Sequence, residues 1–303
     1  MKYAVTGGAG FVGNNIVRLL VSKGHDVVVV DNLHVGKKEN LEGVYEKIQF
    51  YNTDIRNFEE LENVLKNVDG IFHEAALTIV QESFSKKDEY FDVNVHGTEN
   101  ILKIAKKHKI KVVFASSSAV YGNIIDIPIT EESERNPINP YGETKLQNEI
   151  LAEKYSSEGI KVIGLRYFNI FGKGQTGSYA GVITKFMKKI FQNEALEIFG
   201  DGEQTRDFIH VNDVAKINLI VMESDINFGF FNVGTGISTS VNNLAEIMVK
   251  LSNKKLDVNY KKSLEGDIKQ SVADTKETEK KFKWKSKIGL KEGLKKLLEE
   301  DNY

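Results

Sequence analysis

The sequence predicts an α/β protein with a doubly wound parallel sheet and a smaller C-terminal lobe, and three observations support this fold class. Strand-like apolar segments alternate with segments of helical periodicity through the first half of the 303-residue chain. Residues 27–30 form an unbroken run of valines, which is typical of a parallel strand buried on both faces. A glycine-rich turn at residues 7–13 joins the first strand-like segment to the first helical one.

Six strands and four helices are predicted in the first half of the chain. The first helix places Ile16, Leu19 and Leu20 on one face, and Gly24 follows it in the manner of a C-terminal cap. The predicted strands are residues 3–6, 25–31, 48–52, 70–73, 112–116 and 161–167. The predicted helices are residues 11–23, 58–68, 89–107 and 141–157.

Beyond residue 169 the alternation loosens, and we predict a lobe that covers the carboxyl edge of the sheet. No linker marks a boundary, so residues 1–168 and 169–303 are expected to share one core, with some later segments returning to the first domain. Residues 276–296 are rich in lysine but keep leucines at helical spacing, which favours a solvated amphipathic helix over a basic binding tail. Further helices are predicted at residues 181–192, 212–222 and 241–251.

The composition argues against several classes of function. A formal net charge of −2 gives no electrostatic reason to expect a nucleic-acid or anionic-membrane partner. The chain has no cysteine, which rules out disulfides, thiolate catalysis and cysteine-ligated metals, and we expect no metal site. No apolar run reaches the ~20 residues that span a bilayer, and no secretory signal precedes the first strand-like segment, so we expect a cytoplasmic protein.

The turn after the first strand has the context expected of a dinucleotide cradle. Gly7, Gly10 and Gly13 follow a strand and open a helix, where glycine permits close backbone approach to a pyrophosphate beside the positive helix N-terminus. Asp31 ends the second strand, and a carboxylate there can accept hydrogen bonds from both ribose hydroxyls while repelling a 2′-phosphate. These features predict a Rossmann domain that binds NAD in preference to NADP, and a structural turn without cofactor is the less favoured alternative.

Asp54 and Ile55 follow the third strand, and two interpretations of this pair remain open. Asp54 could cap the helix that begins near residue 57, as aspartate often does. Alternatively, Asp54 and Ile55 could contact the edge of an adenine ring. The local sequence favours neither interpretation over the other.

A second motif places a phenol near an ammonium group. Tyr141 and Lys145 share one face of a helix that begins at Pro140, a residue suited to the first helical position. A free phenol titrates near ~10, and a neighbouring ammonium and a positive nicotinamide ring would lower that pKa and make Tyr141 a base. The serines at residues 116–118 end a strand, where α/β sheets place ligands, although a polar strand end is the alternative. Tyr-x-x-x-Lys also occurs by chance, but in this order the motifs indicate hydride transfer with a bound nicotinamide.

Together these motifs resemble those of the extended short-chain dehydrogenase/reductases, and within them the UDP-glucose 4-epimerase type. The resemblance extends over nearly the whole chain. It is carried by residues 6–13, 54–55, 75–76, 94–98, 116–122, 141–145, 166–169, 200–211 and 266–274. It implies NAD-dependent 4-epimerisation of a UDP-hexose through a transient 4-keto sugar, with UDP-glucose and UDP-galactose as the expected pair.

The resemblance also implies roles for individual residues. The catalytic residues would be Ser117, Tyr141 and Lys145, with Ser118 as the alternative to Ser117. NAD would be bound by Gly7, Gly10, Phe11, Val12, Gly13, Asp31, Asn32, Asp54, Ile55, Ala75, Asn94, Tyr141, Lys145 and Phe168. The UDP-sugar would be bound by Thr78, Ser117, Asn169, Arg206 and Ser271.

Two further expectations concern the sugar and the assembly. Ser271 matches a position where a bulky tyrosine in some relatives restricts the space beside the sugar's 2-substituent, so serine predicts tolerance of an N-acetyl group. The resemblance implies a homodimer with a four-helix interface, formed by helices 89–107 and 141–157. Part of that interface could come from Ile101, Leu102, Ile104, Ala105, Ile150 and Leu151, although some of these must face the sheet instead.

The chain departs from the family pattern at two positions. Leu264 stands where an arginine for the diphosphate is expected, and a nearby lysine such as Lys269 could substitute only as a point charge. Glu74 replaces a residue that is usually apolar beside Ala75. Both departures bear on how the substrate is bound.

Other functions on the same fold are less favoured. Related dehydratases and decarboxylases carry an acid just after the catalytic serine or threonine, and Ser118 and Ala119 occupy those positions here. Simple epimerisation is therefore preferred, and the alternative is another nucleotide-sugar-modifying enzyme of the same family, such as a UDP-glucuronate epimerase, a dehydratase or a decarboxylase. A non-catalytic NAD-binding sensor would not need Tyr141 and Lys145, and this chain retains both.

Overall fold

A seven-stranded, fully parallel sheet forms the centre of the computed structural model, which describes residues 1–175, 181–264 and 266–300. The strand order is β11-β6-β5-β4-β1-β2-β3, so the chain winds outward in both directions from β1 and β4. This confirms the doubly wound fold class. The strands are β1 (Lys2–Thr6), β2 (Asp26–Val30), β3 (Ile48–Tyr51), β4 (Gly70–His73), β5 (Lys111–Ser117), β6 (Val162–Tyr167) and β11 (Phe228–Val233).

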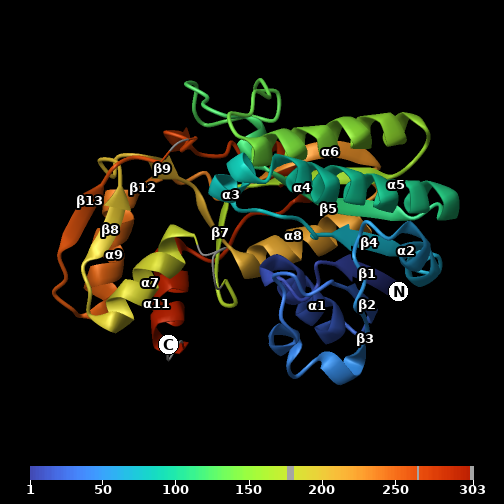
Figure 1. Cartoon of the computed structure of the whole chain (residues 1–303), viewed down its shortest axis with the longest axis horizontal. Helices are drawn as coiled ribbons and strands as arrows, with labels where there is room; N and C mark the ends of the chain where they lie inside the picture. Colours follow the sequence, from blue (N-terminus) through green and yellow to red (C-terminus); the bar gives the residue numbers. More distant parts are fainter. Residues whose placement is uncertain (176–180, 265, 301–303) are drawn as a thin grey trace.

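Helices cover both faces of this sheet (Figure 1). Strand residues alternate between the two faces, so Tyr3 and Val5 pack into one apolar layer and Ala4 into the other. The first layer contains α1 (Phe11–Ser22), α8 (Val211–Glu223) and α10 (Lys276–Phe282). The second layer contains α2 (Phe58–Leu65), α5 (Gly97–His108) and α6 (Pro140–Ser157).

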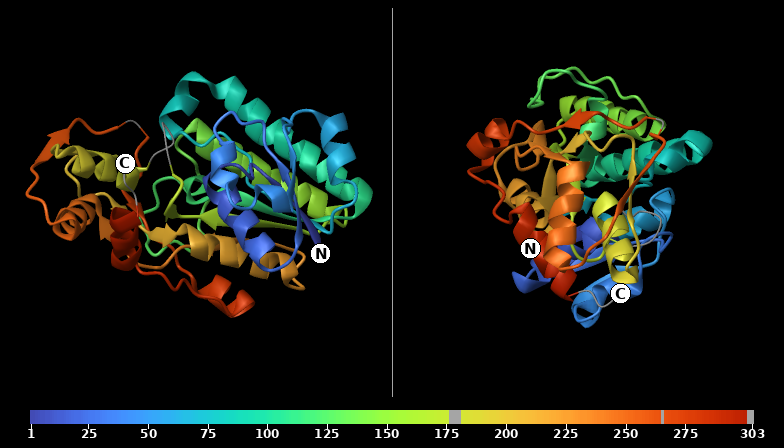
Figure 2. Two further views of the ribbon diagram at one scale, coloured as in Figure 1. Left: turned by 90° about the horizontal axis from the view of Figure 1, so that it is seen from below. Right: turned by 90° about the vertical axis from the view of Figure 1, so that its left-hand side faces the viewer.

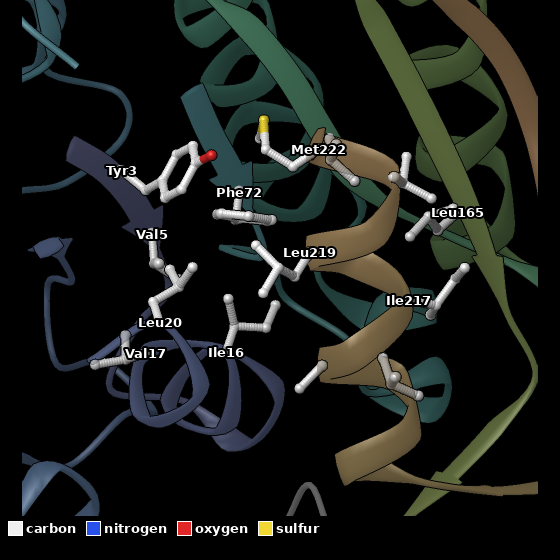
Figure 3. Close-up of a cluster of buried hydrophobic side chains, with 14 of the residues drawn as sticks. Tyr3, Val5, Ile16, Val17, Leu20, Phe72, Leu165, Ile217, Leu219 and Met222 are labelled. Atoms are coloured by element: carbon white, nitrogen blue, oxygen red, sulfur yellow. The ribbon is translucent and has the colours of Figure 1, made fainter. Parts of the chain in front are cut away.

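The first apolar layer packs helices from distant parts of the sequence against each other. In Figure 3, Ile16 of α1 lies next to Leu219 of α8 beneath Phe72 of the sheet. All three side chains are buried, and burying a large apolar side chain contributes about 1.5–3 kcal/mol relative to leaving it exposed. The later segments therefore return to the first domain through α8, α10 and the seventh strand, while the division at residues 168 and 169 stays a prediction.

The predicted helix 89–107 is divided in the structure. A short helix α3 (Val80–Ser85) precedes α4 (Lys87–Phe91), a π-helical turn η3 (Asp92–His96) follows, and the chain then enters α5. Single π-turns of this kind are frequent near functional sites. The described residues also form three short 3₁₀ helices, namely η1 (Lys38–Leu41), η2 (Tyr45–Lys47) and η4 (Ser118–Val120).

The smaller lobe has its own apolar core, and Figures 1 and 2 show it beside the carboxyl ends of the central strands. Its helices are α7 (Val182–Gln192), α9 (Val241–Ser252) and α11 (Leu290–Glu300). Its strands are β7 (Asn169–Phe171), β8 (Leu196–Phe199), β9 (Thr205–Arg206), β10 (Phe208–His210), β12 (Thr239–Ser240), β13 (Val258–Lys261) and β14 (Gln270–Ser271). Within the described part of the lobe, these strands pair as β10-β7, β12-β9-β14 and β13-β8.

The prediction of one solvated helix over residues 276–296 is wrong. Two helices form instead, because Lys283 takes up a left-handed conformation with φ of +48° and ends α10. Leu294 and Leu297 of α11 are buried in the core of the smaller lobe. No helix in the described ranges has the length and apolar character needed to cross a membrane.

Candidate active site

The turn between β1 and α1 forms a backbone cradle at the carboxyl edge of the sheet. Gly7 has a φ of +66°, in the region that favours glycine. A Cβ atom on Gly13 would overlap the carbonyl oxygen of Gly7, so the turn and the helix meet at a distance that only glycine allows. Gly10 is the N-cap of α1 and offers no side chain to the first-turn N–H groups. Such a helix N-terminus suits a pyrophosphate.

Asp31 lies beside this cradle, directly after β2. Its carboxylate accepts hydrogen bonds from the N–H groups of Ala9 (2.9 Å) and Leu33 (2.8 Å). Burial raises the pKa of Asp31, and the two backbone bonds act in the opposite direction. The carboxylate is thereby held in a fixed orientation at the wall of the cleft.

Asp54 is held by a neighbouring arginine rather than acting as a helix cap. Arg56 donates to both carboxylate oxygens of Asp54 (2.9 and 2.8 Å), and its side-chain bonds lower the pKa of Asp54 to about 2. Asn32 donates to the same carboxylate (2.8 Å). The N-cap of α2 is Asn57, which accepts from the N–H of Glu60, so the capping interpretation of Asp54 is wrong.

Ser117, Tyr141 and Lys145 come together on one wall of the cleft, which we call the catalytic wall. Ser117 is the last residue of β5, and its hydroxyl hydrogen-bonds to the Tyr141 phenol. Asn139 caps α6 by accepting from Gly142 N–H (2.8 Å), which fixes the first turn that carries Tyr141. The Lys145 ammonium donates to the carbonyl oxygen of Ala115 (2.8 Å) and lies 5.9 Å from the centre of the Tyr141 ring.

The ionisation of this wall is set mainly by burial. Burial raises the pKa of Tyr141 to about 12, while the bond from Ser117 acts in the opposite direction. Burial also lowers the pKa of Lys145 to about 8. The expectation that Lys145 and a cationic nicotinamide ring together lower the pKa of Tyr141 stays a prediction, because in the protein groups alone desolvation of the phenolate is the largest influence.

Glu74 is an ionisable residue of the cleft to which the sequence analysis gave no role. It directly follows β4 and lines the same cleft as Tyr141 and Lys145. Tyr167 donates its phenol proton to Glu74 at 3.0 Å. Burial raises the pKa of Glu74 to about 7, and Tyr167 and Lys145 oppose this shift. An acidic residue at a position that is usually apolar was the signal that could have identified it.

Most of the residues proposed from the sequence line one continuous cleft, which runs from the cradle to the catalytic wall. Tyr167 and Arg56, like Glu74, also line it and were not predicted. The predicted residues on the cleft come from strand ends and the loops that follow them, the first turn of α1, and the first two turns of α6. They are Gly7, Gly10, Phe11, Val12, Gly13, Asp31, Asn32, Asp54, Ile55, Ala75, Thr78, Ser117, Tyr141, Lys145, Phe168 and Asn169.

Asn94 does not line the cleft but supports its wall. Its side chain is fully buried in the π-helical turn. It exchanges hydrogen bonds with the backbone of Leu77 (2.8 and 3.0 Å) and donates to the hydroxyl of Thr144 (3.0 Å). Asn94 thus ties the loop after β4 to the helix that carries Tyr141.

Arg206 and Ser271 lie in the smaller lobe, beyond the residues that line the cleft. They are register partners in the parallel pair of β9 and β14. Arg206 forms an ion pair with Asp267 (2.5 Å), and Ser271 is buried. Leu264, at the position expected for an arginine, is partly exposed. The structure describes no group of three or more His, Asp or Glu side chains that could hold a metal ion.

A buried ion pair braces the elements that carry the catalytic wall. Arg166 of β6 donates to both carboxylate oxygens of Glu149 in α6, each at 2.8 Å, and both residues are almost completely buried. Ser116 donates to the same carboxylate (2.6 Å). The pair connects β5, β6 and α6 immediately next to Ser117 and one helical turn from Lys145.

Fold and site together define a nicotinamide-dependent enzyme of the short-chain dehydrogenase/reductase class. The NAD dependent epimerase/dehydratase family model matches residues 3–234. A putative UDP-glucose 4-epimerase from Methanocaldococcus jannaschii is 40% identical over 299 residues, covering 97% of this chain and 96% of that protein.

Solved structures agree with this assignment. UDP-glucose 4-epimerase from Thermotoga maritima with UDP-glucose has a TM-score of 0.95 and 35% identity, covering 99% of this chain and 98% of the other. UDP-N-acetylglucosamine 4-epimerase from Methanobrevibacter ruminantium with UDP-N-acetylmuramic acid has a TM-score of 0.94 and 37% identity, covering 98% and 97%. The chain belongs to the NAD dependent epimerase/dehydratase family and is of the UDP-glucose 4-epimerase type, with NAD as cofactor.

Proposed function

We propose that this protein is an NAD-dependent 4-epimerase of UDP-hexoses. The observation that carries the proposal is the position of Ser117, Tyr141 and Lys145 on one wall of the cleft that begins at the glycine cradle. The similarity to epimerases solved with UDP-glucose and with UDP-N-acetylmuramic acid supports a UDP-sugar as the substrate. The proposed pair is UDP-glucose and UDP-galactose, with UDP-GlcNAc and UDP-GalNAc as further substrates.

NAD fits the residues of the cleft. The first turn of α1 would hold the pyrophosphate, because Gly7 and Gly13 let the preceding turn and the helix approach closely there. Asp31 and Asn32 would hold the adenosine ribose, and Asp54 and Ile55 would flank the adenine. In this proposal Lys145 holds the nicotinamide ribose. When bound, the cofactor accepts a hydride from the sugar carbon and returns it to the same carbon.

The chain's own residues would move the proton. Tyr141 takes the proton of the sugar 4-hydroxyl, and Ser117 hydrogen-bonds to the same oxygen and keeps it beside the phenol. To act as a base the phenol must lose its proton, but burial raises its pKa to about 12. Tyr141 would be deprotonated more readily beside a cationic nicotinamide ring, which would lower this pKa. The 4-keto sugar then turns within the cleft, and Tyr141 returns the proton on the opposite face.

The sugar nucleotide would bridge the two lobes. Asn169 lines the cleft and follows Phe168 at the start of the smaller lobe. Arg206 would hold the diphosphate with its forked guanidinium. Because Arg206 is paired with Asp267, the diphosphate must compete with a carboxylate for the same donors.

The family also contains dehydratases, and these form the second candidate. Ser118 and Ala119, which follow the catalytic serine, provide no acid or base for elimination. They form a 3₁₀ turn, and Ala119 N–H donates to Ser117 (3.1 Å). This absence of an acid favours simple epimerisation. A non-catalytic sensor would leave the Tyr141–Lys145 pair without a purpose.

The test is an assay of the purified protein with UDP-galactose and with UDP-GalNAc. We expect epimerised product without net formation of reduced cofactor. Tyr141→Phe removes one hydroxyl and should lower the rate ~10²–10⁴-fold without loss of NAD binding. Tyr155→Phe is the matched control, because Tyr155 lies in the same helix but packs in the core. Near-normal turnover by Tyr141→Phe would refute the assignment of Tyr141 as the base. A dehydrated product from the unmutated protein would show that the reaction is elimination and not epimerisation.

A further inference from the structure

Glu74 occupies a fixed position on the wall of the cleft. Its backbone N–H donates to the carbonyl oxygen of Thr6 (3.1 Å), which joins the end of β4 to the end of β1. The side chain lines the cleft between the glycine cradle and the catalytic wall. Neither the proposed proton transfer nor the binding of the sugar nucleotide uses this carboxyl group.

The carboxyl group is oriented by a hydrogen-bond chain. Asn218 of α8 donates to the phenol oxygen of Tyr167 (2.7 Å), so the phenol proton of Tyr167 is directed to Glu74 Oε1 (3.0 Å). Among the described residues, no other side chain forms a hydrogen bond with Glu74 that would hold the second oxygen, Oε2. A polar atom left in this way on a cleft wall is available to a bound molecule.

Few charges surround Glu74. From α6 the Lys145 ammonium attracts it, and the Tyr141 phenol, if ionised, would be repelled by it. From β6 the Tyr167 phenol donates to it. His73, the preceding residue, hydrogen-bonds instead to Thr6 and Thr98, and burial keeps it neutral with a pKa lowered to about 3. The Glu74 carboxylate is therefore a negative charge that acts on both Tyr141 and Lys145.

We propose that Glu74 is a counter-charge that favours the oxidised, cationic nicotinamide over the reduced, neutral one. The inference rests on the proposed function for the position of the ring. The hydride leaves the sugar C4 and the proton leaves the hydroxyl group on that carbon, so the ring must lie beside the group that Tyr141 reaches. Glu74 interacts electrostatically with Tyr141 and Lys145 at that end of the cleft. A carboxylate there keeps the resting enzyme in the oxidised state that accepts hydride from the sugar.

The counter-charge responds to pH near neutrality. Glu74 is ionised above its pKa of about 7 and neutral below it. The preference for oxidised cofactor should therefore strengthen as the pH rises through that value. Tyr167→Phe removes the bond that opposes the burial of the charge, so the midpoint of this transition should move to higher pH.

The experiment compares the two redox states of the cofactor without any sugar. The holoprotein is equilibrated with equal amounts of NAD and NADH, and the reduced fraction of the bound cofactor is read from nicotinamide absorbance. Glu74→Gln keeps the shape but removes the charge. At about pH 8.5 we expect it to shift the ratio of bound NADH to bound NAD upward ~10-fold, equivalent to ~30 mV for a two-electron couple.

Controls separate this effect from others. At about pH 5.5 the unmutated protein should approach the ratio of Glu74→Gln. Glu89→Gln removes another carboxylate that lines the cleft, one paired with Lys86, and should leave the ratio unchanged. Equal ratios for the unmutated protein and Glu74→Gln at about pH 8.5, or a pH response that persists in Glu74→Gln, would overturn the inference. Absence of epimerase activity in the unmutated protein would count against the proposed function only, because the ratio of bound NADH to bound NAD is measured without a sugar substrate.

Discussion

Asp31 shows how one residue can serve both the fold and the ligand. Its carboxylate is held by two backbone N–H groups, from Ala9 in the glycine turn and Leu33 after β2. These bonds leave lone pairs that can still accept from ribose hydroxyls. The carboxylate therefore shapes the cradle and sets the charge that a bound dinucleotide meets.

Replacement of Asp31 should weaken NAD binding and relax the preference against NADP. Hydrogen bonds to a charged group contribute about 1.5–3 kcal/mol, so Asp31→Ala should raise the dissociation constant of NAD ~10–100-fold. NADP should be affected less, because the repulsion of its 2′-phosphate disappears as well. Calorimetric titration with both cofactors measures this, with Asp31→Asn as the charge-only control. Tighter binding of NADP than NAD by the unmutated protein would contradict the prediction.

Ser271 is a second single residue with a proposed role, because its side chain would decide which sugars are accepted. It is buried and pairs in register with Arg206. Ser271→Tyr should lower kcat/KM for UDP-GalNAc more than for UDP-galactose, because the phenol would fill space needed by the acetamide. The hexose pair assayed on the same variant is the internal control. An unchanged ratio of the two kcat/KM values would show that Ser271 does not select the sugar.

At the scale of elements, the catalytic wall depends on how α6 is attached to the sheet. Pro140 and the Asn139 cap fix where the helix begins. The ion pair between Glu149 and Arg166 fixes how it lies against β5 and β6. Such a pair costs desolvation when it forms, and removing one partner leaves the other as a buried charge.

Glu149→Gln should therefore lower the free energy of unfolding by about 3–5 kcal/mol. The combined Glu149→Leu and Arg166→Met variant should lose less than Glu149→Leu alone, because no charge is left unpaired. Denaturant unfolding measures both. Glu153→Gln is the control, since Glu153 is exposed and also contacts Arg135, and exposed pairs contribute at most about 1 kcal/mol. A loss below about 1 kcal/mol for Glu149→Gln would mean that the pair does not brace the helix.

At the scale of the whole molecule, ionisation of Glu74 in the cleft lowers the free energy of unfolding. The pKa of Glu74 is raised from 4.5 to about 7 by burial, so the folded state binds its proton more tightly than the unfolded state. The contribution of Glu74 to stability is fully present below about pH 4.5 and is lost as the pH rises through about 7. This cost in stability arises from a side chain that lines the cleft and not from one in the apolar core.

Glu74→Gln should consequently stabilise the protein at alkaline pH. We expect a gain of ~1–3 kcal/mol at about pH 8.5, seen as a higher melting temperature, and little change at about pH 4. Thermal melts across this range provide the measurement. A gain that is equal at both pH values would show that the ionisation of Glu74 is not responsible.

The proposed homodimer concerns the whole molecule as well. Ile101, Leu102, Ile104 and Ala105 are buried in the core of the chain, so these are the members of the predicted set that face inward. The face of α4 and α6 still exposes Phe91 and Ile150. We expect light scattering at micromolar concentration to give twice the mass of the chain. Ile150→Asp should produce monomers, while Ile237→Asp on the smaller lobe should not, and a monomeric unmutated protein would exclude the dimer.

Local patterns were sufficient for much of the fold. The valine run 27–30, the glycine turn and the Tyr141–Lys145 pair appear where the sequence placed them, because each depends on residues near in the chain. The seventh strand, β11, was missed. The pairs β9–β14 and β8–β13 were also missed, since such short strands exist through partners that are remote in sequence.

The sequence by itself determined the doubly wound sheet, the dinucleotide cradle and many of the residues on the cleft, because periodicity and glycine placement are local properties. Tertiary structure alone decided the ionisation of the site. Burial by distant segments raises the pKa values of Tyr141 and Glu74, and Tyr167 reaches Glu74 across the intervening strand β5. Desolvation depends on every group packed around a charge, and no local pattern in the chain encodes that sum.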